Sequence, residues 1–427
     1  MIDRLFRAIR DQIECLFGGS KCYLFKKSES PRPITHIKKS ASFDNEQYYI
    51  GLTRGSAKLT EFEKAIFREL VTALTVLYNG FSSTTHKAHF RTAVSTALTD
   101  ATIARYLRAD ESSAFWSVQS LIQALKKLSF ERYEGAPATT GFLVERIGIS
   151  KFEKYVNKNA FELVKFGETK VVNDDFFSGP LSFRYVDGHH SLYVGRVRKL
   201  AIRISSILDM PNCYSTNVID RLSHANLFKL LDHSGNNSFA AILNNKSEIE
   251  VLDSLNTLFV WRKGKWNIFD PDIFYHFLGD VLDKGSIKTL LWTVYSLSKV
   301  RHGTLILIGD IKRKQLNNLR KGSVAGKHKL SQELLKYLEG KSIIELKENG
   351  ELLRILSADG LTIFDSKGIL IETGFITNTS AIKRDDVTGG GRTTAAVASS
   401  IYGKVVKVSE DGPIEFYEGE RRVYKFG

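Results

Sequence analysis

The chain has 427 residues, of which 43% are hydrophobic and 25% are charged. Values this close to the globular average exclude a disordered chain and leave room for two or three domains with their own cores. The formal net charge of +14 favours anionic partners, but the lysines and arginines are dispersed along the sequence, so nucleic acid is not the partner we expect.

The first segment, residues 1–17, has the pattern of an amphipathic helix with arginines among its polar positions. Its apolar side chains fall on one helical face: Ile2, Leu5, Phe6, Ile9, Ile13 and Leu16. We expect this face to pack on the protein's own domain or on a twin subunit, and a helix lying on a membrane surface is the alternative. Residues 26–42 contain Ser-Pro-Arg-Pro and predict an exposed connector, so that residues 1–44 form a helix and its linker.

Residues 45–140 predict a helix-rich regulatory unit. Thr60-Glu61-Phe62-Glu63 is a capping box, which predicts that a helix begins at this point. Helical spacing of apolar residues continues through 91–108 and 113–128. A stretch with glycine and proline at 135–141 then ends the series.

The next unit, residues 141–280, changes to short aromatic and β-branched runs that predict strands. These runs are 181–185, 191–194, 200–207, 257–261 and 266–269. Residues 260–266, which join the last two runs, predict the tip of a hairpin. We therefore expect a mixed α/β, sensor-like unit, although no motif in it identifies a ligand.

The C-terminal part, residues 285–427, predicts an α/β sandwich on a mixed sheet. A helix at 288–299 leads into the apolar run at 303–309, which is typical of a strand buried on both faces. Further strands are predicted at 361–364, 369–373, 404–408 and 414–417, and further helices at 331–338 and 393–400.

Neither a membrane span nor a disulfide framework is predicted. No run of about eighteen apolar residues occurs, as a transmembrane helix requires. The three cysteines, Cys15, Cys22 and Cys213, form no Cys-x-x-Cys pair and no zinc spacing with histidine. We expect a cytoplasmic protein without a transmembrane segment.

Two glycine-containing turns near the C-terminus carry the residue types of a nucleotide site. They are Ala358-Asp359-Gly360-Leu361 and Gly389-Gly390-Gly391-Arg392-Thr393-Thr394. A carboxylate holds a metal ion or a ribose hydroxyl, and glycines let backbone N–H groups approach phosphate oxygens. Arginine adds a forked, permanently charged donor. Together the two turns predict a site for a triphosphate.

With two neighbouring segments, these turns resemble the diadenylate cyclase (DAC) domain over about residues 285–427. The pieces, in the order of that family, are His302-Gly303-Thr304-Leu305-Ile306-Leu307-Ile308-Gly309-Asp310, then Asp359-Gly360-Leu361, then the triple-glycine turn with Arg392, and last Val408-Ser409-Glu410-Asp411-Gly412-Pro413-Ile414. The resemblance implies a nucleotidyltransferase that condenses two ATP into cyclic di-AMP with release of pyrophosphate. It also implies Mg²⁺ or Mn²⁺ as cofactor and a homo-oligomer with facing active sites, controlled by the upstream region and its unknown ligand.

Roles for single residues follow from the same resemblance. Asp359 and Arg392 are expected to be catalytic, and Asp359 and Glu410 are expected to hold the metal ion. The expected nucleotide-binding residues are Gly360, Leu361, Gly390, Gly391, Thr393, Thr394 and Ser409. Gly390 and Gly391 would present N–H groups to the triphosphate at the start of the helix near Thr393, where the helix dipole favours anions.

The sequence departs from the family pattern in two places. Leu361 stands where the family has alanine, and Thr393-Thr394 follows Arg392 where the family has His-Arg. Two phosphate- and metal-facing side chains are thus replaced by hydroxyls, which carry no positive charge. An altered cyclase is the first interpretation, and the alternative is a nucleotide-binding sensor with a degenerate DAC fold and no turnover. A third interpretation, from the basic excess, is a nucleic-acid-binding protein.

Overall fold

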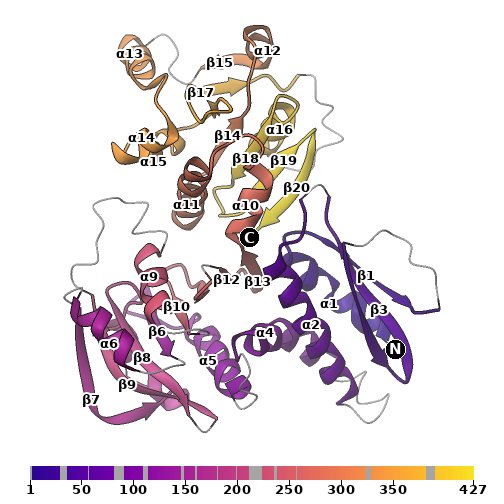
Figure 1. Cartoon of the computed structure of the whole chain (residues 1–427), viewed down its shortest axis with the longest axis vertical. Coiled ribbons are helices and arrows are strands. Elements are labelled where there is room, and N and C mark those ends of the chain that lie inside the picture. Colours follow the sequence, from indigo (N-terminus) through magenta and orange to yellow (C-terminus); the bar gives the residue numbers. More distant parts are fainter. Residues whose placement is uncertain are drawn as a thin grey trace. The chain divides into compact units, whose positions relative to one another are not determined.

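The computed structural model describes the chain except for residues 1, 29–35, 56, 81–90, 109–113, 146–148, 159–160, 180, 199, 211–223, 235–237, 256, 324–327 and 381–389. It has two compact units (Figure 1). Unit 1 consists of Met1–Thr53, Leu59–Tyr214 and Ala225–Asp270, and unit 2 consists of Pro271–Gly427 together with Arg54–Lys58 and His224. The finer division of the upstream region at residues 44 and 140 remains a prediction.

Unit 1 begins with the expected helix, α1 (Ile2–Leu16), whose apolar face is buried within the unit. This face packs against β1 (Lys21–Lys26), α4 (Arg91–Leu107) and β13 (Lys265–Phe269), which confirms packing on the protein's own domain. A three-stranded sheet follows in the order β1-β3-β2, with β2 at Ile37–Phe43 and β3 at Glu46–Thr53.

The prediction of an exposed connector over 26–42 is wrong in its second half, because residues 37–42 belong to strand β2. Alternation explains the error: Ala41 and Phe43 point into the core while Lys38 and Ser40 face outward, so a half-polar strand resembles a linker in sequence. The Ser-Pro-Arg-Pro stretch lies outside the described residues.

The capping box at Thr60 is confirmed. Thr60 Oγ1 accepts a hydrogen bond from the Glu63 backbone N–H at 3.0 Å, and the Thr60 N–H donates to Glu63 Oε2 at 3.0 Å. These two bonds start α2 (Glu61–Asn79), which packs against α4, while α4 packs against α5 (Ala114–Leu128). The predicted helices at 91–108 and 113–128 are therefore present.

The rest of unit 1 is an eight-stranded mixed sheet in the order β13-β12-β11-β10-β6-β8-β9-β7. Its strands not yet given are β6 (Thr140–Glu145), β7 (Glu162–Val171), β8 (Ser191–Arg198), β9 (Ala201–Asp209), β10 (Phe239–Leu243), β11 (Ile249–Asp253) and β12 (Leu258–Arg262). The short elements around it are β4 (Arg132–Tyr133), β5 (Ala136–Pro137), α6 (Ile149–Lys158), the 3₁₀ turn η1 (Asp174–Phe177), α7 (Leu181–Arg184) and α9 (Ala225–Ser234). Helix α7 corrects the strand predicted at 181–185, because a run this short carries too little periodicity to separate strand from helix.

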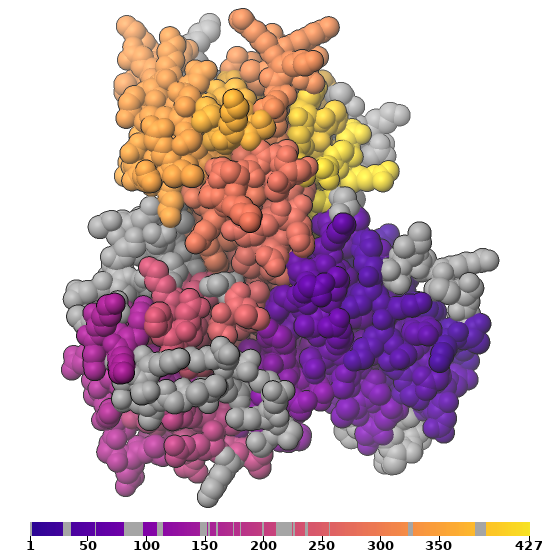
Figure 2. All heavy atoms as spheres, in the orientation of Figure 1, coloured from indigo at the N-terminus to yellow at the C-terminus, as the bar shows by residue number. Residues whose placement is uncertain are grey.

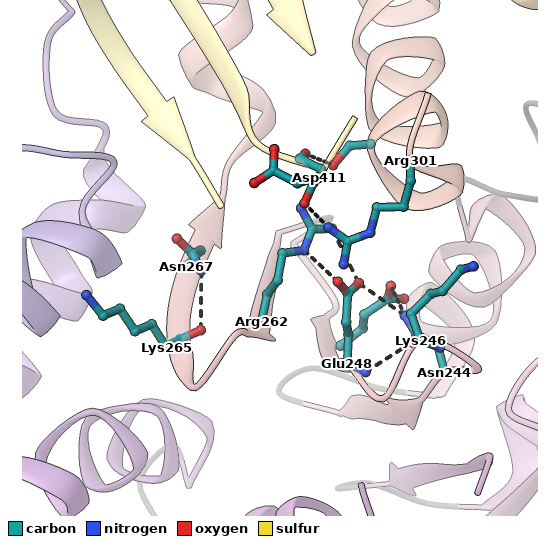
Figure 3. A network of polar contacts seen from close by, with 11 residues as sticks. Asn244, Lys246, Glu248, Arg262, Lys265, Asn267, Arg301 and Asp411 are labelled. Atoms are coloured by element: carbon teal, nitrogen blue, oxygen red, sulfur yellow. Dashed lines mark hydrogen bonds and ion pairs between the residues drawn. The ribbon is translucent and has the colours of Figure 1, made fainter. Parts of the chain in front are cut away.

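The predicted hairpin tip is confirmed between β12 and β13, where Lys263 and Gly264 have φ angles of 50° and 80°. A buried ion pair ties this hairpin to the start of β11 (Figure 3). Arg262 Nε lies 2.7 Å from Glu248 Oε1, and the two side chains are 2% and 3% exposed. Asn244 Nδ2 donates to the neighbouring Glu250 Oε1 at 3.0 Å. Each of these buried carboxylates accepts a hydrogen bond, which offsets the free-energy cost of burying its charge.

Unit 2 contains a seven-stranded mixed sheet in the order β15-β17-β16-β14-β18-β19-β20. The strands are β14 (Thr304–Ile308), β15 (Arg320–Ser323), β16 (Leu361–Phe364), β17 (Leu370–Thr377), β18 (Lys404–Val408), β19 (Ile414–Glu418) and β20 (Arg421–Phe426). The helices are α10 (Pro271–Leu278), α11 (Lys284–Val300), α12 (Arg313–Leu319), α13 (Lys329–Leu338), α14 (Ile343–Glu348), α15 (Leu352–Leu356) and α16 (Gly391–Ser399). Every helix and strand predicted between 288 and 417 is present.

Helices cover both faces of the sheet in unit 2. On one face, Leu305, Leu361 and Val405 of the central strands form a core cluster with Ala396 and Val397 of α16. On the other face, β19 packs against α10 through the aromatic rings of Phe416 and Phe277, which stack at 4.6 Å. Alternation along each strand sends apolar side chains to both faces, as a sheet covered by helices on each side requires. The unit is thus a mixed α/β layered structure.

Helix α13 lies on the surface of unit 2 (Figure 2), and none of its side chains is buried. Among the described helices, none is both long enough and apolar enough to cross a lipid bilayer.

Candidate functional site

One edge of the unit 2 sheet gathers the residues that the sequence singled out. Strands β14 and β16 are parallel neighbours, and β18 runs antiparallel on the other side of β14. The beginnings of β14 and β16 and the end of β18 therefore lie at the same edge. Gly303 directly precedes β14, Asp359-Gly360 precedes β16, and Ser409-Glu410 follows β18.

Arg392 joins this edge from the first turn of α16. Its Nη1 lies 2.6 Å from Glu410 Oε1, and its Nη2 lies 3.3 Å from Asp359 Oδ1. The arginine side chain is 34% exposed, whereas those of Asp359 and Glu410 are 75% and 71% exposed. The hydrogen bond that Arg392 donates to Glu410 and the charges of both carboxylates raise the pKa of Arg392 further above its ordinary value. Three residues from three separate segments are thus brought together, with both carboxylates open to solvent.

Gly303 leaves the space that this guanidinium occupies. A Cβ atom at Gly303 would lie 2.5 Å from Arg392 Nη1 and 2.9 Å from its Cζ, closer than atoms can approach. A side chain at position 303 would therefore require the Arg392 guanidinium to shift. No role for Gly303 was predicted, and the signal for one is a glycine directly before a fully buried strand.

The Asp359-Gly360 turn is fixed by its glycine. Gly360 has a φ of +97°, which side chains rarely permit, and a Cβ there would lie 2.8 Å from the carbonyl carbon of Gly374 in β17. The Gly360 N–H donates to Asp359 Oδ1 at 2.9 Å. The same carboxylate oxygen that meets Arg392 is therefore also held by the turn.

Leu361 does not line the exposed part of this edge. Its side chain is 1% exposed and lies in the core cluster, paired with Leu305 on one side and Phe375 on the other. The same cluster contains Ala396 of α16.

The remaining predicted residues lie at the start of α16 and in the turn after β18. Gly390 is the N-cap of α16, and its carbonyl accepts hydrogen bonds from the N–H groups of Thr393 and Thr394 at 2.9 and 3.2 Å. No atom lies within 4 Å of a Cβ built at Gly390 or Gly391, so these positions face open space. Ser409 N–H donates to the carbonyl of Pro413 at 2.8 Å, which closes the turn that carries Glu410. Gly389 lies outside the described residues.

A buried polar network beside α16 was not predicted. Lys407 Nζ lies 2.6 Å from Glu415 Oε2 on the adjacent strand, and it donates to Thr393 Oγ1 at 2.8 Å. Glu415 also accepts from Tyr417 Oη at 3.0 Å and pairs with Arg422 Nη1 at 2.9 Å. The Lys407 and Glu415 side chains are only 8% and 6% exposed. The pair follows from strand register, Lys407 opposite Glu415, which the sequence does not reveal.

This network shifts the acidity of its members. Burial alone would raise the pKa of Glu415, but the hydrogen bond and charge of Lys407 and the charge of Arg422 lower it below its ordinary value. Burial and the neighbouring Glu415 carboxylate raise the pKa of Tyr417, so this phenol stays protonated at physiological pH. The Glu415 carboxylate is therefore ionised, and it is the counter-charge of the buried ammonium.

Acid unfolding tests the Glu415 pair. Because the pKa of Glu415 is lower in the folded chain than in the unfolded chain, its stabilising contribution is complete above the unfolded pKa of about 4.3 and is lost as pH falls through the folded pKa. We expect the free energy of unfolding of the wild type to fall more steeply between about pH 5 and pH 3 than that of Glu415→Gln. Denaturant titrations across this range measure the slope, and Glu348→Gln, at an exposed position of α14, is the control. Equal slopes for the wild type and Glu415→Gln would contradict the assignment.

The carboxylates at this edge are suited to a hard divalent cation. Mg²⁺ is commonly held by one or two carboxylates together with water and substrate phosphates, and Asp359 and Glu410 supply such a pair of oxygen donors. In the part of the chain that the structure describes, no group of three or more His, Cys, Asp or Glu side chains forms a ready-made metal cage.

Comparisons with known proteins add little to this geometry. No protein-family model matches the chain, and no curated protein matches it. Among solved structures, it is similar to a chain described as a hypothetical membrane spanning protein from Bacillus cereus, with 15% sequence identity. That similarity covers 37% of this chain and 70% of the other, with a TM-score of 0.27. Such a low TM-score carries no argument about fold or function.

Proposed function

We propose that unit 2 is a DAC-like nucleotidyltransferase that condenses two ATP into cyclic di-AMP with release of pyrophosphate. One observation carries this proposal: Asp359, Arg392 and Glu410 come from three separate segments and meet at one sheet edge, beside the N-terminus of α16. Such a group combines carboxylates for a metal ion or a hydroxyl with a cation and helix N–H groups for phosphates.

The reaction asks the protein for positioning and charge neutralisation more than for covalent help. In each step, a ribose 3′-oxygen bonds to the α-phosphorus of the other ATP, the bond from that phosphorus to pyrophosphate breaks, and the hydroxyl proton is lost. Asp359 would orient the attacking hydroxyl, and Arg392 would turn from the carboxylates to the phosphates. A bound Mg²⁺ or Mn²⁺, held by Asp359 and Glu410, supplies further neutralisation of the phosphate charge.

A second candidate function is a nucleotide-binding sensor without turnover. The first turn of α16 favours it, because two threonines follow Arg392 there. The Thr393 hydroxyl also accepts a hydrogen bond from Lys407. Arg392 then remains the single cation of that turn. Binding needs less from the site than catalysis, because only groups that interact more strongly in the transition state accelerate the reaction.

Direct assays separate these functions. We expect purified protein incubated with ATP and Mg²⁺ or Mn²⁺ to yield cyclic di-AMP and pyrophosphate, identified by mass spectrometry. Calorimetry with a non-hydrolysable ATP analogue measures binding independently. Binding without any cyclic dinucleotide product, tested with all four nucleoside triphosphates, selects the sensor. No binding and no product removes both functions.

Head-to-tail joining of two nucleotides requires two facing pockets, so we propose that the active form is a homo-oligomer with two-fold symmetry. Turnover per protomer is then expected to rise with protein concentration until the oligomer is fully formed. Initial rates measured across a hundredfold range of protein concentration test this expectation. Rates strictly proportional to concentration over that range would argue against assembly from monomers during the assay.

We further propose that the protein acts in the cytoplasm and that unit 1 regulates unit 2 in response to a ligand. The size and extensive core of unit 1 support a regulatory domain, but they do not identify its signal. The basic excess leaves a rival, nucleic-acid binding, which predicts a steep loss of affinity with salt and little competition from ATP. A filter-binding salt series with and without ATP distinguishes this rival from a nucleotide site.

A further inference from the structure

We propose that Lys407 is a positioning residue of the triphosphate site, which acts through Thr393 at the start of α16. This inference rests on the proposed nucleotide site and extends it to a residue on the neighbouring strand. The observation that carries it is the bond from Lys407 Nζ to Thr393 Oγ1 at 2.8 Å, next in sequence to Arg392.

Burying the ammonium group of Lys407 costs free energy unless favourable contacts offset the loss of water. Removing an ammonium group from water costs free energy, and a cation beside the N-terminus of a helix opposes the helix dipole. Packed apolar residues often stabilise such a location as well as a buried ion pair does. The Lys407 side chain is nevertheless only 8% exposed, and its partner across the strand pair β14–β18 is the apolar Leu305. An anion bound at the start of α16 would turn the unfavourable charge into a favourable one.

The counter-charge of Lys407 is shared. Glu415 pairs with Lys407 and also with Arg422, whose side chain is 50% exposed. One carboxylate therefore faces two cations, so Lys407 shares its counter-charge with a half-exposed arginine.

Thr393 is held through its side chain and its backbone. Its hydroxyl accepts a hydrogen bond from Lys407, and its N–H donates to the carbonyl of Gly390 at 2.9 Å. A threonine fixed in this way anchors the first helical turn, and with it the backbone from which Arg392 extends. Lys407 thus sets the position of Arg392 and adds positive potential under the phosphates.

ATP and AMP differ in the number of phosphates, so comparing their binding shows whether Lys407 acts through its charge or only supports the structure. We expect Lys407→Met to weaken binding of a non-hydrolysable ATP analogue about tenfold, which corresponds to ~1.4 kcal/mol, and to change the affinity for AMP less than threefold. Lys407→Arg should recover most of the loss. Lys367→Met, which removes an exposed lysine at the opposite edge of the same sheet, is the matched control and should bind like the wild type.

Removing the negative partner of Lys407 gives a second test, because it changes the charge in the opposite direction. Glu415→Gln keeps hydrogen-bonding oxygen and nitrogen atoms but removes the negative charge, so we expect it to tighten binding of the ATP analogue two- to fivefold. Loss of packing alone would weaken binding in both Lys407→Met and Glu415→Gln. If Lys407→Met does not fold, Thr393→Val leaves the Lys407–Glu415 pair in place and should weaken binding of the ATP analogue threefold or more, again with little effect on AMP.

The outcomes distinguish this inference from the proposed function. If the wild type binds no ATP analogue, the nucleotide site is absent and both proposals are lost. If the wild type binds and folded Lys407→Met binds the ATP analogue equally well, or loses ATP analogue and AMP by the same factor, the role of Lys407 is overturned and the nucleotide site stands.

Discussion

Asp359→Asn is expected to lower the rate of cyclic di-AMP formation by about 10²–10³-fold while leaving the fold intact. Asparagine keeps the size of the side chain and one oxygen, but it loses the charge that holds a divalent cation or orients a hydroxyl. The Asp359 side chain is 75% exposed, so its replacement removes little packing. Initial rates of product formation, with thermal unfolding measured on the same samples, test both parts of the expectation.

Arg392→Lys is expected to reduce the rate to a similar extent. Lysine preserves the charge but cannot span Asp359 and Glu410 with two N–H groups, as the guanidinium does. Glu348→Gln, remote from this sheet edge on α14, serves as the control for both variants. A wild-type rate in either variant would contradict the catalytic role proposed for that residue. If Asp359→Asn loses both product formation and folding, the milder substitution Asp359→Glu replaces it.

The sequence predicts unit 2 well because its central strands carry strong local signals. The run at 303–309 is apolar on both faces, and glycines at Gly303 and Gly309 bound it, so length and composition alone identify a buried strand. The capping box at Thr60 and the hairpin at Lys263-Gly264 are equally local, since neighbouring residues make the decisive hydrogen bonds or turn. Each of these features is specified within a few residues of sequence.

The missed features depend on residues that are distant in sequence. Nothing within β18 shows that Lys407 is buried, because its burial depends on Glu415 in the next strand and on Thr393 in α16. The need for a glycine at position 303 arises from its close approach to Arg392, almost ninety residues away. The strand at 37–42 was missed because its outward face is polar, so only the sheet it joins reveals it. A sequence pattern reports a residue's own preferences, whereas a site is made by contacts across the sheet.

Leu361 shows the same dependence on distant contacts. The sequence places it among the expected nucleotide-binding residues, directly after the Asp-Gly turn. In the structure its side chain lies in the core cluster with Ala396 of α16, whereas Asp359, in the turn before β16, stays at the exposed edge. Leu361 therefore packs under α16, away from the exposed part of the edge.

Gly360→Ala is expected to lower the free energy of unfolding of unit 2 by about 3 kcal/mol, because two penalties add. A φ of +97° disfavours any side chain, and the new Cβ would lie 2.8 and 2.9 Å from backbone atoms of Gly374 and Phe375. Those atoms belong to β17, which pairs with β16 and cannot move away without breaking the sheet. The turn that presents Asp359 thus depends on a glycine whose replacement separates two paired strands.

Gly350→Ala separates the two penalties. Gly350 also has a positive φ, +69°, but nothing lies within 4 Å of a Cβ built there, so we expect a loss of only about 1 kcal/mol. Hydrogen exchange of peptides covering β16 and β17 reports the stability of this part of the sheet without interference from unit 1. Equal losses in the two variants would mean that Gly374 yields to the added methyl group. A larger loss in Gly360→Ala means instead that the close approach of β16 and β17 is rigid, and that the sheet itself holds the turn that presents Asp359.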